Sequence, residues 1–369
     1  MESGPPLWPL FLLLSLLLLT TDNKGLRLSP AAISQSACSS PPRIRRAGRV
    51  PVPLVDYRRQ SFPSSRVIRW RTTQTRTSQD DQGEGVHCIN PKLEKPLHRR
   101  NPIAKALLML TACTFKALLG VYNNVKIHNG ERLIRAVEGR ENGTGLFTVS
   151  NHASMLDPAI VASMYPWHRD LDMPHWPPWT LCTDSFFRVH PLIAFWLKSG
   201  KAMPITRASP KGMKQKYLRD FFDRLNAGEW CHVYPEGKIT QPWRFEKGQS
   251  RLGKFLPGMG KLLTSCSTLP LLIPIYHKGM HDVLPEEPGD PRLPAKPISI
   301  FPRGGRQIDI YIGEPIDITD LCSAAAGTTT TMTSGQKDWE SDSKEDLRVW
   351  LTISKRVQNA MSKLEKEVD

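Results

Sequence analysis

The sequence has few of the features that mark disulfide-rich, zinc-binding or nucleic-acid-binding proteins. Its seven cysteines are scattered, odd in number and free of any C-x-x-C pair. Such a set argues against a disulfide framework or a zinc site and favours buried, inert thiols in a reducing compartment. No RRM, zinc-finger or helix-turn-helix pattern is present, so we expect no nucleic acid partner and no metal.

The N-terminal region lacks a hydrophobic run long enough for a comfortable membrane span. Residues 7–19, LWPLFLLLSLLLL, have the length of a signal-peptide core, but Glu2 precedes them and no basic residue does. The stretch that follows is rich in Arg and Ser and nearly free of acids, as organelle transit peptides are. Because these patterns conflict, we interpret residues 1–97 as a targeting or disordered leader that is a transit peptide, a signal or an anchor.

The formal net charge of +15 is unevenly distributed. Residues 1–79 contain eleven arginines and Lys24 but only three acidic residues, a net charge of +9. This leaves +6 for the remaining 290 residues. A mildly basic remainder suits an anionic membrane surface or a substrate that carries phosphate.

An apolar helix is the first segment that we expect to be ordered. PIAKALLMLTACTFKALLGVY (102–122) carries only Lys105 and Lys116, which are eleven residues apart and therefore share one side of a helix. This stripe favours a membrane-associating helix over residues 98–122 that inserts in the membrane plane. The alternative is a core helix with snorkelling lysines.

Residues 123–320 alternate between short apolar strands and helices. SFFRVHPLIAFWL (185–197) is either a buried helical turn or a second membrane-dipping element, and DPAIVASMY and KGMKQKYLRDFFDRLNAG are predicted helices. The pattern predicts a single α/β domain with a mixed, largely parallel sheet flanked by helices. The predicted strands are GLFTVS (145–150), WTLCT (179–183), AMPITR (202–207), WCHVYPEG (230–237), LPLLIPIY (269–276) and QIDIYIGEPI (307–316).

The C-terminal part contains a low-complexity insert and an amphipathic helix. Residues 321–337 are expected to be flexible. Residues 338–369 are expected to hold a helix that docks on the domain or on a lipid surface. Its apolar positions are Leu347, Trp350, Val357, Met361, Leu364 and Val368.

The pattern H-x-x-x-x-D occurs twice, at His152 to Asp157 and at His277 to Asp282. The first copy directly follows a predicted strand and precedes Pro158, a residue favoured early in a helix. Ligands bind at such strand ends in α/β sheets, and a histidine there can deprotonate a hydroxyl while a carboxylate fixes its tautomer. The alternative is a histidine that caps or packs in a loop.

Two further strand ends carry polar groups. GKAMPITR ends in Arg207, whose planar guanidinium suits a phosphate. YPEGK places Glu236 beside Gly237, which allows close backbone approach. Together with His152, these ends would present a base, a phosphate clamp and a carboxylate.

These stretches resemble, in order, the four sequence blocks of glycerol-phosphate and lysophospholipid acyltransferases: NHASMLDP, GKAMPITR, YPEGK and LLIPIY. Within that superfamily, LNAGEWCHVYPEGKI, an RF…G stretch and IPIYHKGMHDVLPEEP resemble the tafazzin family and its plant relatives. The resemblance covers about residues 100–320.

The resemblance implies a phospholipid–lysophospholipid O-acyltransferase that remodels glycerophospholipids such as cardiolipin. His152 would be the general base for a lysolipid hydroxyl and Asp157 its orienting partner, with direct attack on an acyl ester and no acyl-serine at Ser154. The acyl group would come from another phospholipid, without coenzyme A, another cofactor or a metal. Acyl-CoA-dependent acylation and N-acylphosphatidylethanolamine synthesis are the alternatives, and a non-catalytic lipid-binding protein is another.

Substrate contacts are implied for five further residues. Gly200 and Arg207 would contact the phosphate or head group, Glu236 and Gly237 would hold the acyl acceptor, and Pro274 would shape the acyl site.

The second H-x-x-x-x-D copy is expected to line or brace the site. The resemblance further implies attachment to a membrane surface, in the inner or outer mitochondrial membrane, with the endomembranes or plasma membrane as alternatives. The sequence leaves the oligomeric state open.

Overall fold

The computed structural model describes residues 93–164, 176–207, 209, 212–246, 249–289, 297–299, 301–322 and 343–368. Most of the expected leader (1–97) and of the expected flexible insert (321–337) lies outside these ranges. All of the elements below belong to one compact unit.

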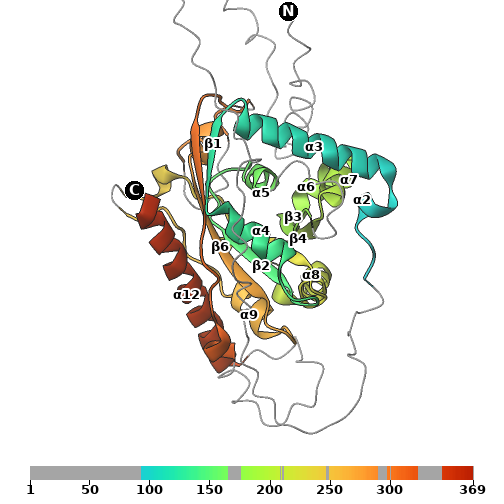
Figure 1. Ribbon diagram of the computed structural model, residues 1–369, viewed down its shortest axis with the longest axis vertical. Helices are drawn as coiled ribbons and strands as arrows, with labels where there is room; N and C mark the ends of the chain where they lie inside the picture. Colours follow the sequence, from blue (N-terminus) through green and yellow to red (C-terminus); the bar gives the residue numbers. More distant parts are fainter. Residues whose placement is uncertain are drawn as a thin grey trace, which may run out of the picture. The chain divides into compact units, whose positions relative to one another are not determined.

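A seven-stranded sheet forms the centre of this unit, with the strand order β1-β7-β6-β2-β5-β3-β4 (Figure 1). Every pairing is parallel except that of β6 with β7. The predicted mixed, largely parallel sheet is therefore confirmed. The strands are β1 (Asn124–His128), β2 (Leu146–Ser150), β3 (Trp179–Thr183), β4 (Ala202–Ile205), β5 (Trp230–Val233), β6 (Leu271–Lys278) and β7 (Gln307–Ile312).

Helices cover both faces of the sheet. Those in the first part of the described chain are α2 (Leu97–Arg100), α3 (Pro102–Gly120) and α4 (Gly130–Glu138). The middle of the chain forms α5 (Pro158–Ser163), α6 (Asp184–Val189), α7 (Pro191–Ser199), η4 (Gly212–Lys214), α8 (Lys216–Asn226) and η5 (Pro242–Arg244). The last are α9 (Gly258–Thr264), α10 (Met280–Val283) and α12 (Lys344–Val368).

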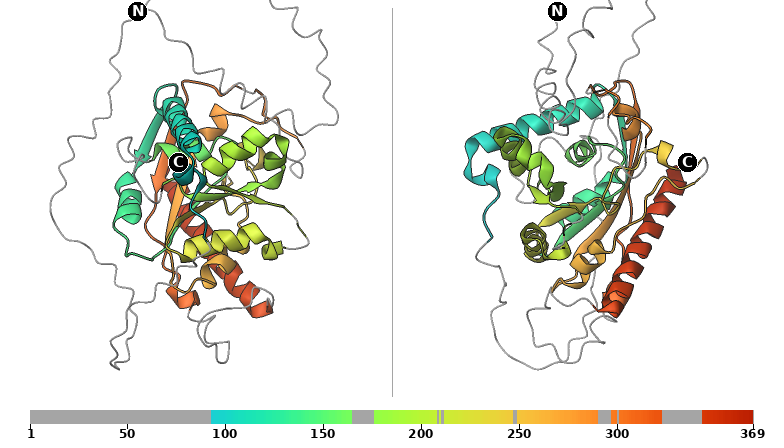
Figure 2. Two further views of the ribbon diagram at one scale, coloured as in Figure 1. Left: turned by 90° about the vertical axis from the view of Figure 1, so that its right-hand side faces the viewer. Right: turned by 180° about the vertical axis from the view of Figure 1, so that it is seen from behind.

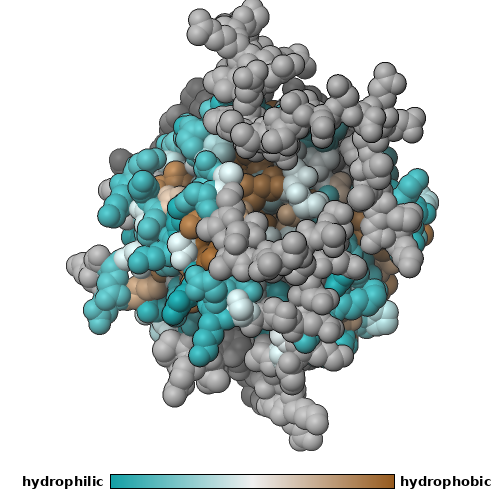
Figure 3. Space-filling view, turned by 90° about the horizontal axis from the view of Figure 1, so that it is seen from below, coloured by the Kyte–Doolittle hydropathy of each residue, from teal (hydrophilic) through white to brown (hydrophobic). Residues whose placement is uncertain are grey.

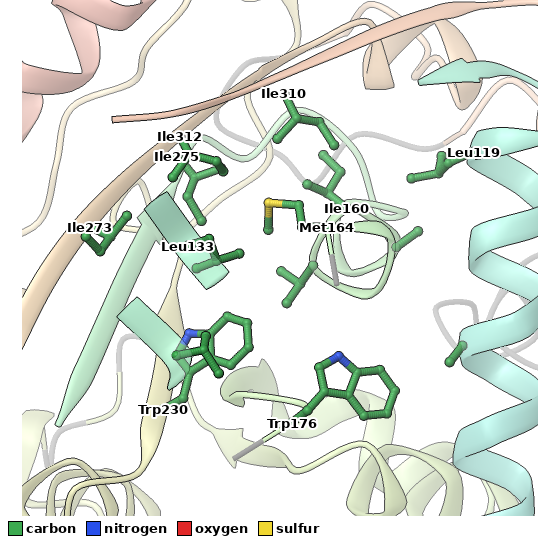
Figure 4. Packing of buried hydrophobic residues seen from close by; sticks show 14 of the residues in the cluster. Leu119, Leu133, Ile160, Met164, Trp176, Trp230, Ile273, Ile275, Ile310 and Ile312 are labelled. Carbon is green, nitrogen blue, oxygen red and sulfur yellow. The ribbon is translucent and has the colours of Figure 1, made fainter. Parts of the chain in front are cut away.

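Two hydrophobic layers hold the helices on the sheet. Side chains of α3, α4 and α5 pack with alternate residues of the strands, and Figure 4 shows Leu133 beside Ile273 and Ile275 of β6 and Ile160 beside Ile310 of β7. On the other face, α8, α9 and α12 pack on the intervening strand residues. Figures 1 and 2 show α12 on one side of the sheet and α3 and α5 on the other. All five residues of β2 are buried, as expected of a strand covered on both faces.

Helix α3 has an exposed apolar stripe in place of the expected lysine stripe. Lys105 is exposed, but only 5% of Lys116 is, because the C-terminal half of the helix packs against α5 and β1. The lysine-stripe prediction is therefore wrong. Ile103 is 69% exposed and Leu110 37%. By length and composition α3 is one helix that is apolar enough to cross a membrane, with 33% of the apolar window buried in the protein.

The segment 185–197 forms two short helices, α6 and α7, which join at Pro191. In α7, Ile193 is buried and Leu192 is 64% exposed. Trp196 donates a hydrogen bond from Nε1 to Thr111 Oγ1 of α3 at 2.8 Å. Helices α3 and α7 therefore lie side by side, and each presents apolar side chains to the outside.

The C-terminal helix α12 docks on the sheet domain. Ile353, Val357 and Met361 have no exposed surface, whereas Leu347 at the start of the helix is 43% exposed. The side chain of Val368 lies outside the described residues. Of the two expected partners of this helix, the domain and a lipid surface, the structure shows contact with the domain.

On the face shown in Figure 3, the described residues are mostly hydrophilic with scattered hydrophobic patches.

Close approach of α12 to α9 depends on Gly260. A Cβ at this position would lie 2.5 Å from Cα of Trp350, closer than atoms can approach. We expect Gly260→Ala to lower the free energy of unfolding by about 1–3 kcal/mol, because α12 must shift or strain. Denaturant unfolding of the purified domain measures this.

Gly120→Ala provides the matched control, since a Cβ at the end of α3 would meet nothing within 4 Å. This variant should be neutral or slightly stabilising, because alanine restricts the unfolded chain. Equal effects of the two variants would contradict the role of Gly260.

Candidate active site

The carboxyl ends of β2, β3, β4, β5 and β6 meet at one edge of the sheet, because these strands run parallel. The loop after β2 carries His152, and the turn after β5 carries Tyr234 and Glu236. Arg207 follows β4, and His277 lies near the end of β6. The edge therefore collects the residues of three of the predicted blocks.

His152 and Asp157 form a hydrogen-bonded pair. Nδ1 of His152 lies 2.8 Å from Oδ2 of Asp157, and the His152 side chain is 15% exposed while that of Asp157 is fully buried. The same oxygen accepts hydrogen bonds from the backbone N–H groups of Ala153 (2.7 Å) and Ser154 (2.9 Å). Since a carboxylate only accepts, Nδ1 carries the proton and Nε2 is left as the base.

Glu236 fastens the loop that carries His152. Its Oε1 accepts the backbone N–H of His152 at 3.0 Å, and its Oε2 accepts the N–H of Gly253 at 3.0 Å and the hydroxyl of Thr240. The N–H of Thr240 in turn donates to the carbonyl of His152 at 2.7 Å. Burial raises the pKa of Glu236. In the structure, the Glu236 carboxylate is therefore hydrogen-bonded to other residues of the protein. Its contact with the acyl acceptor stays a prediction.

His277 braces the loop from the other side. Its Nε2 donates to the carbonyl of Asn151 at 2.8 Å, and its backbone N–H and carbonyl bond the Asn151 side-chain amide, each at 2.9 Å. Asn151 therefore cross-links β6 to the loop and does not cap a helix. Asp282 is 59% exposed in its side chain and lies beside His281, so His277 and Asp282 form no dyad.

A third histidine, His232, lies behind the dyad on β5. Its Nδ1 is 2.8 Å from Thr148 Oγ1 and its Nε2 is 3.2 Å from Ser150 Oγ. Burial, reinforced by the neighbouring histidines, lowers the pKa of His232 to about 3. Burial also lowers the pKa of His277, despite the opposing charge of Asp157. Both rings are therefore neutral at pH 7 and add no positive charge behind His152.

Tyr234 stacks on the catalytic histidine candidate. The ring centroids of His152 and Tyr234 are 4.2 Å apart with an interplanar angle of 20°. The ring of His232 also contacts Tyr234, in an edge-to-face arrangement with the ring centroids 4.9 Å apart. The stack and the bond to Asp157 together fix the plane of the His152 imidazole.

Gln241 joins three loops at this edge. Its Nε2 donates to the carbonyls of Ala153 (3.0 Å) and Leu284 (3.1 Å), and its Oε1 accepts the N–H of Glu286 at 2.9 Å. Glu286 is 3% exposed, and burial raises its pKa against the opposing charge of Arg244. Neither Gln241 nor Glu286 was predicted from the sequence, although Glu286 lies in a stretch that carried the tafazzin resemblance and Gln241 follows another by two residues.

The remaining predicted residues lie at different distances from the dyad. Arg207 is exposed at the carboxyl end of β4, and its charge opposes the burial that raises the pKa of Cys182 to about 11. Gly237 occupies the turn after β5 with a backbone φ of +67°, which residues with a side chain rarely adopt. Both are at the same sheet edge as His152, and their substrate contacts stay predictions.

Gly200 and Pro274 are not brought to the dyad. Gly200 ends α7 ahead of β4, at the opposite edge of the sheet from Arg207. Pro274 lies inside β6, and its Cγ is close to the position that a Cβ on Gly313 would occupy. The carbonyl of Pro274 accepts the N–H of Gly313, which lies just beyond the end of β7. The N–H that proline lacks would also lie beyond β7, so the pairing of β6 with β7 loses no hydrogen bond.

The described residues contain no group of three or more His, Cys, Asp or Glu arranged to hold a metal ion. The candidate site consists of an imidazole that a buried carboxylate orients through Nδ1, which leaves Nε2 for proton transfer. Such a pair can take a proton from a hydroxyl and return it to a leaving group.

Comparisons with known proteins find an acyltransferase domain and several relatives. The acyltransferase family model matches residues 124–278, which include the dyad and Glu236. N-acylphosphatidylethanolamine synthase of Arabidopsis thaliana is 28% identical over 57% of this chain and 69% of its own length. Tafazzin of Drosophila melanogaster is 26% identical (64% and 57%), and the Dictyostelium discoideum protein named taffazin is 32% identical (46% and 54%). The chain thus spans less than two thirds of the length of the latter two relatives.

Among solved structures, the 1-acyl-sn-glycerophosphate acyltransferase of Thermotoga maritima aligns with a TM-score of 0.42 and 15% identity, over 72% of this chain and 83% of that one.

The acyltransferase family match, which spans His152 and Asp157, supports an O-acyltransferase. Similarity to tafazzins of several species specifies the group further. The chain is similar to the tafazzin family and carries an acyltransferase family match over residues 124–278.

The two histidines of the repeated pattern should respond differently to replacement. We expect His152→Ala to lower kcat for acyl transfer to a lysophospholipid about 10²–10⁴-fold, because the base is lost, while binding of lipid vesicles is retained. Steady-state transfer and vesicle co-sedimentation measure the two effects.

His277→Ala is the matched control. It should keep measurable turnover but unfold at lower denaturant, because the bond to Asn151 and the packing of a buried ring are lost. If His277→Ala were as inactive as His152→Ala while still folded, the assignment of the base to the first histidine alone would be wrong.

Proposed function

We propose that this protein transfers an acyl chain from one phospholipid to a lysophospholipid and thereby remodels glycerophospholipids such as cardiolipin. The observation that carries the proposal is the His152–Asp157 pair, whose Nε2 is left as a base at a sheet edge that also holds Arg207. The tafazzin relatives support the phospholipid substrate class.

In this mechanism the lysolipid hydroxyl approaches Nε2 of His152, which removes its proton as the oxygen attacks the acyl carbonyl. Asp157 stabilises the imidazolium that forms. Collapse of the tetrahedral intermediate expels the donor's alkoxide, which takes the proton back from Nε2. The protein's own groups provide every proton transfer in this sequence, and no cofactor or metal is invoked. Arg207 would hold the phosphate of the acceptor.

Two alternatives concern the substrates. Both are still acyl transfers, but the second forms an amide in place of an ester. Acyl-CoA replaces the phospholipid donor in the first, with a thiolate as leaving group. The second is N-acylation of phosphatidylethanolamine, favoured by the similarity to the Arabidopsis N-acylphosphatidylethanolamine synthase. In that case, the nucleophile is the neutral amine, and His152 would take the proton that the nitrogen loses as it attacks the acyl carbonyl.

The acyl donor and acceptor can be identified in one assay. Purified protein is incubated with monolysocardiolipin or phosphatidylethanolamine and with labelled phosphatidylcholine or labelled acyl-CoA, and His152→Ala serves as the blank. We expect label to pass from phosphatidylcholine to monolysocardiolipin. Transfer from acyl-CoA alone would refute phospholipid-dependent transfer, and label only in phosphatidylethanolamine would establish the second alternative.

We also propose that the protein works on a membrane surface, in a mitochondrial membrane, with α3 and α7 in contact with lipid. The exposed apolar side chains of these helices support this, and α3 packs directly on α5, the helix that Asp157 precedes. The oligomeric state enters nowhere in this scheme.

Charge on this surface should release the protein from lipid. We expect Leu110→Asp combined with Leu192→Asp to weaken co-sedimentation with anionic vesicles at least about tenfold, because two charges enter the apolar contact. Leu347→Asp with Leu351→Asp is the control, since these residues of α12 are similarly exposed, at 43% and 42%. If the control released the protein equally, or if neither pair did, lipid contact would have to lie elsewhere. Leu108 and Leu119 are unsuitable for this test because both are buried.

A further inference from the structure

The hydroxyl of Tyr234 is a buried polar group for which the fold provides no partner. The Oη atom is inaccessible to solvent and has no hydrogen-bond partner among the described residues. Buried hydroxyls are normally paired, since an unpaired one costs stability. The stacking of this ring on His152 would be the same for phenylalanine, so packing alone does not account for the hydroxyl.

The position of Tyr234 lies between the base and the predicted phosphate contact. Strand β5 lies between β2 and β3 in the sheet, so the residue that follows β5 lies between the ends of these strands. On one side the ring contacts His152. On the other side is Cys182 of β3, followed by β4 and Arg207. Along the sheet, Tyr234 therefore lies between His152 and Arg207.

Tyr234 is held as a neutral hydrogen-bond donor. Burial raises the pKa of its phenol well above the usual value, and the charge of Asp157 acts in the same direction. At neutral pH the group cannot act as a base or a nucleophile. It can donate one hydrogen bond, and an oxygen that gains negative charge is the strongest acceptor that it could meet.

We propose that the Tyr234 hydroxyl donates a hydrogen bond to the oxyanion that forms on the acyl carbonyl during transfer. This inference rests on the proposed acyl transfer. As the acceptor oxygen bonds to the carbonyl carbon, the C=O π electrons move onto oxygen and the hydroxyl proton moves to Nε2 of His152. The phenol keeps its proton throughout. When the intermediate collapses, the C=O bond re-forms, the donor C–O bond breaks and the leaving alkoxide takes the proton from His152.

A preorganised donor at this point acts on the transition state more than on the bound ester, because the charge develops only during attack. We therefore expect that removal of this donor changes kcat with little change in KM. It also explains why an unpaired hydroxyl is tolerated: its partner exists only during the reaction.

Tyr234→Phe tests the proposal, because it removes one oxygen and leaves the ring on His152. We expect kcat to fall about 100-fold, with KM for donor and acceptor changed less than about twofold. The unfolding midpoint should stay the same or rise, because an unpaired buried group is removed. The control is Tyr276→Phe, whose hydroxyl donates to Glu365 of α12 at 3.4 Å. That variant should keep wild-type kcat and lose a little stability.

Wild-type kcat in Tyr234→Phe would overturn the proposal. So would a rise in KM alone, which would show ground-state binding, or a loss of activity that parallels a loss of stability, which would show packing. The proposed function fails separately, if the wild-type protein transfers no acyl group or if His152→Ala transfers as fast as the wild type.

Discussion

One carboxylate oxygen organises the active-site loop. Oδ2 of Asp157 accepts two backbone N–H groups and the Nδ1–H of His152, so it folds residues 152–157 around itself and orients the imidazole at the same time. The usual cost of burying a charge is offset because three donors converge on it. Catalytic geometry and local folding therefore depend on the same atom, and neither can change without the other.

The sheet provides the surroundings that this loop needs. Parallel strands bring Glu236, His277 and the His152 loop to one edge, and each fastens the loop through the backbone. The loop is thus held by its main chain on both sides and by Asp157 from within. Only the Nε2 side of the histidine is left for substrate.

The sequence predicted the fold well where hydrophobic strands follow one another with helices between them. All six predicted strands are present, and the mixed sheet is confirmed. Strand β1, NVKIH, was overlooked because it is a short edge strand whose two apolar residues, Val125 and Ile127, alternate with polar ones. The prediction of a lysine stripe on α3 was wrong for a different reason. Helical spacing fixes the side of the helix on which Lys116 lies, but the neighbouring elements decide whether that side is exposed.

The dyad could be predicted because its two members are five residues apart and bounded by a strand and a proline. Gln241, which binds the backbone of the same loop, could not be found in this way. Its partners Leu284 and Glu286 are more than forty residues away, and an amide that bonds backbone carbonyls leaves no pattern in the sequence. Spacing also could not show that Gly200 and Arg207 lie at opposite ends of one strand.

The docking of α12 has a consequence for the synthesis of the protein. This helix follows every strand in the chain, and it completes the hydrophobic layer that β2, β6, α8 and α9 begin. While the polypeptide is still being made, that layer remains open to solvent, whereas α3, α4 and α5 can already cover the other face of the early strands. Nascent chains would therefore expose one apolar face until α12 has been synthesised and has docked, and chaperones would find their binding site there.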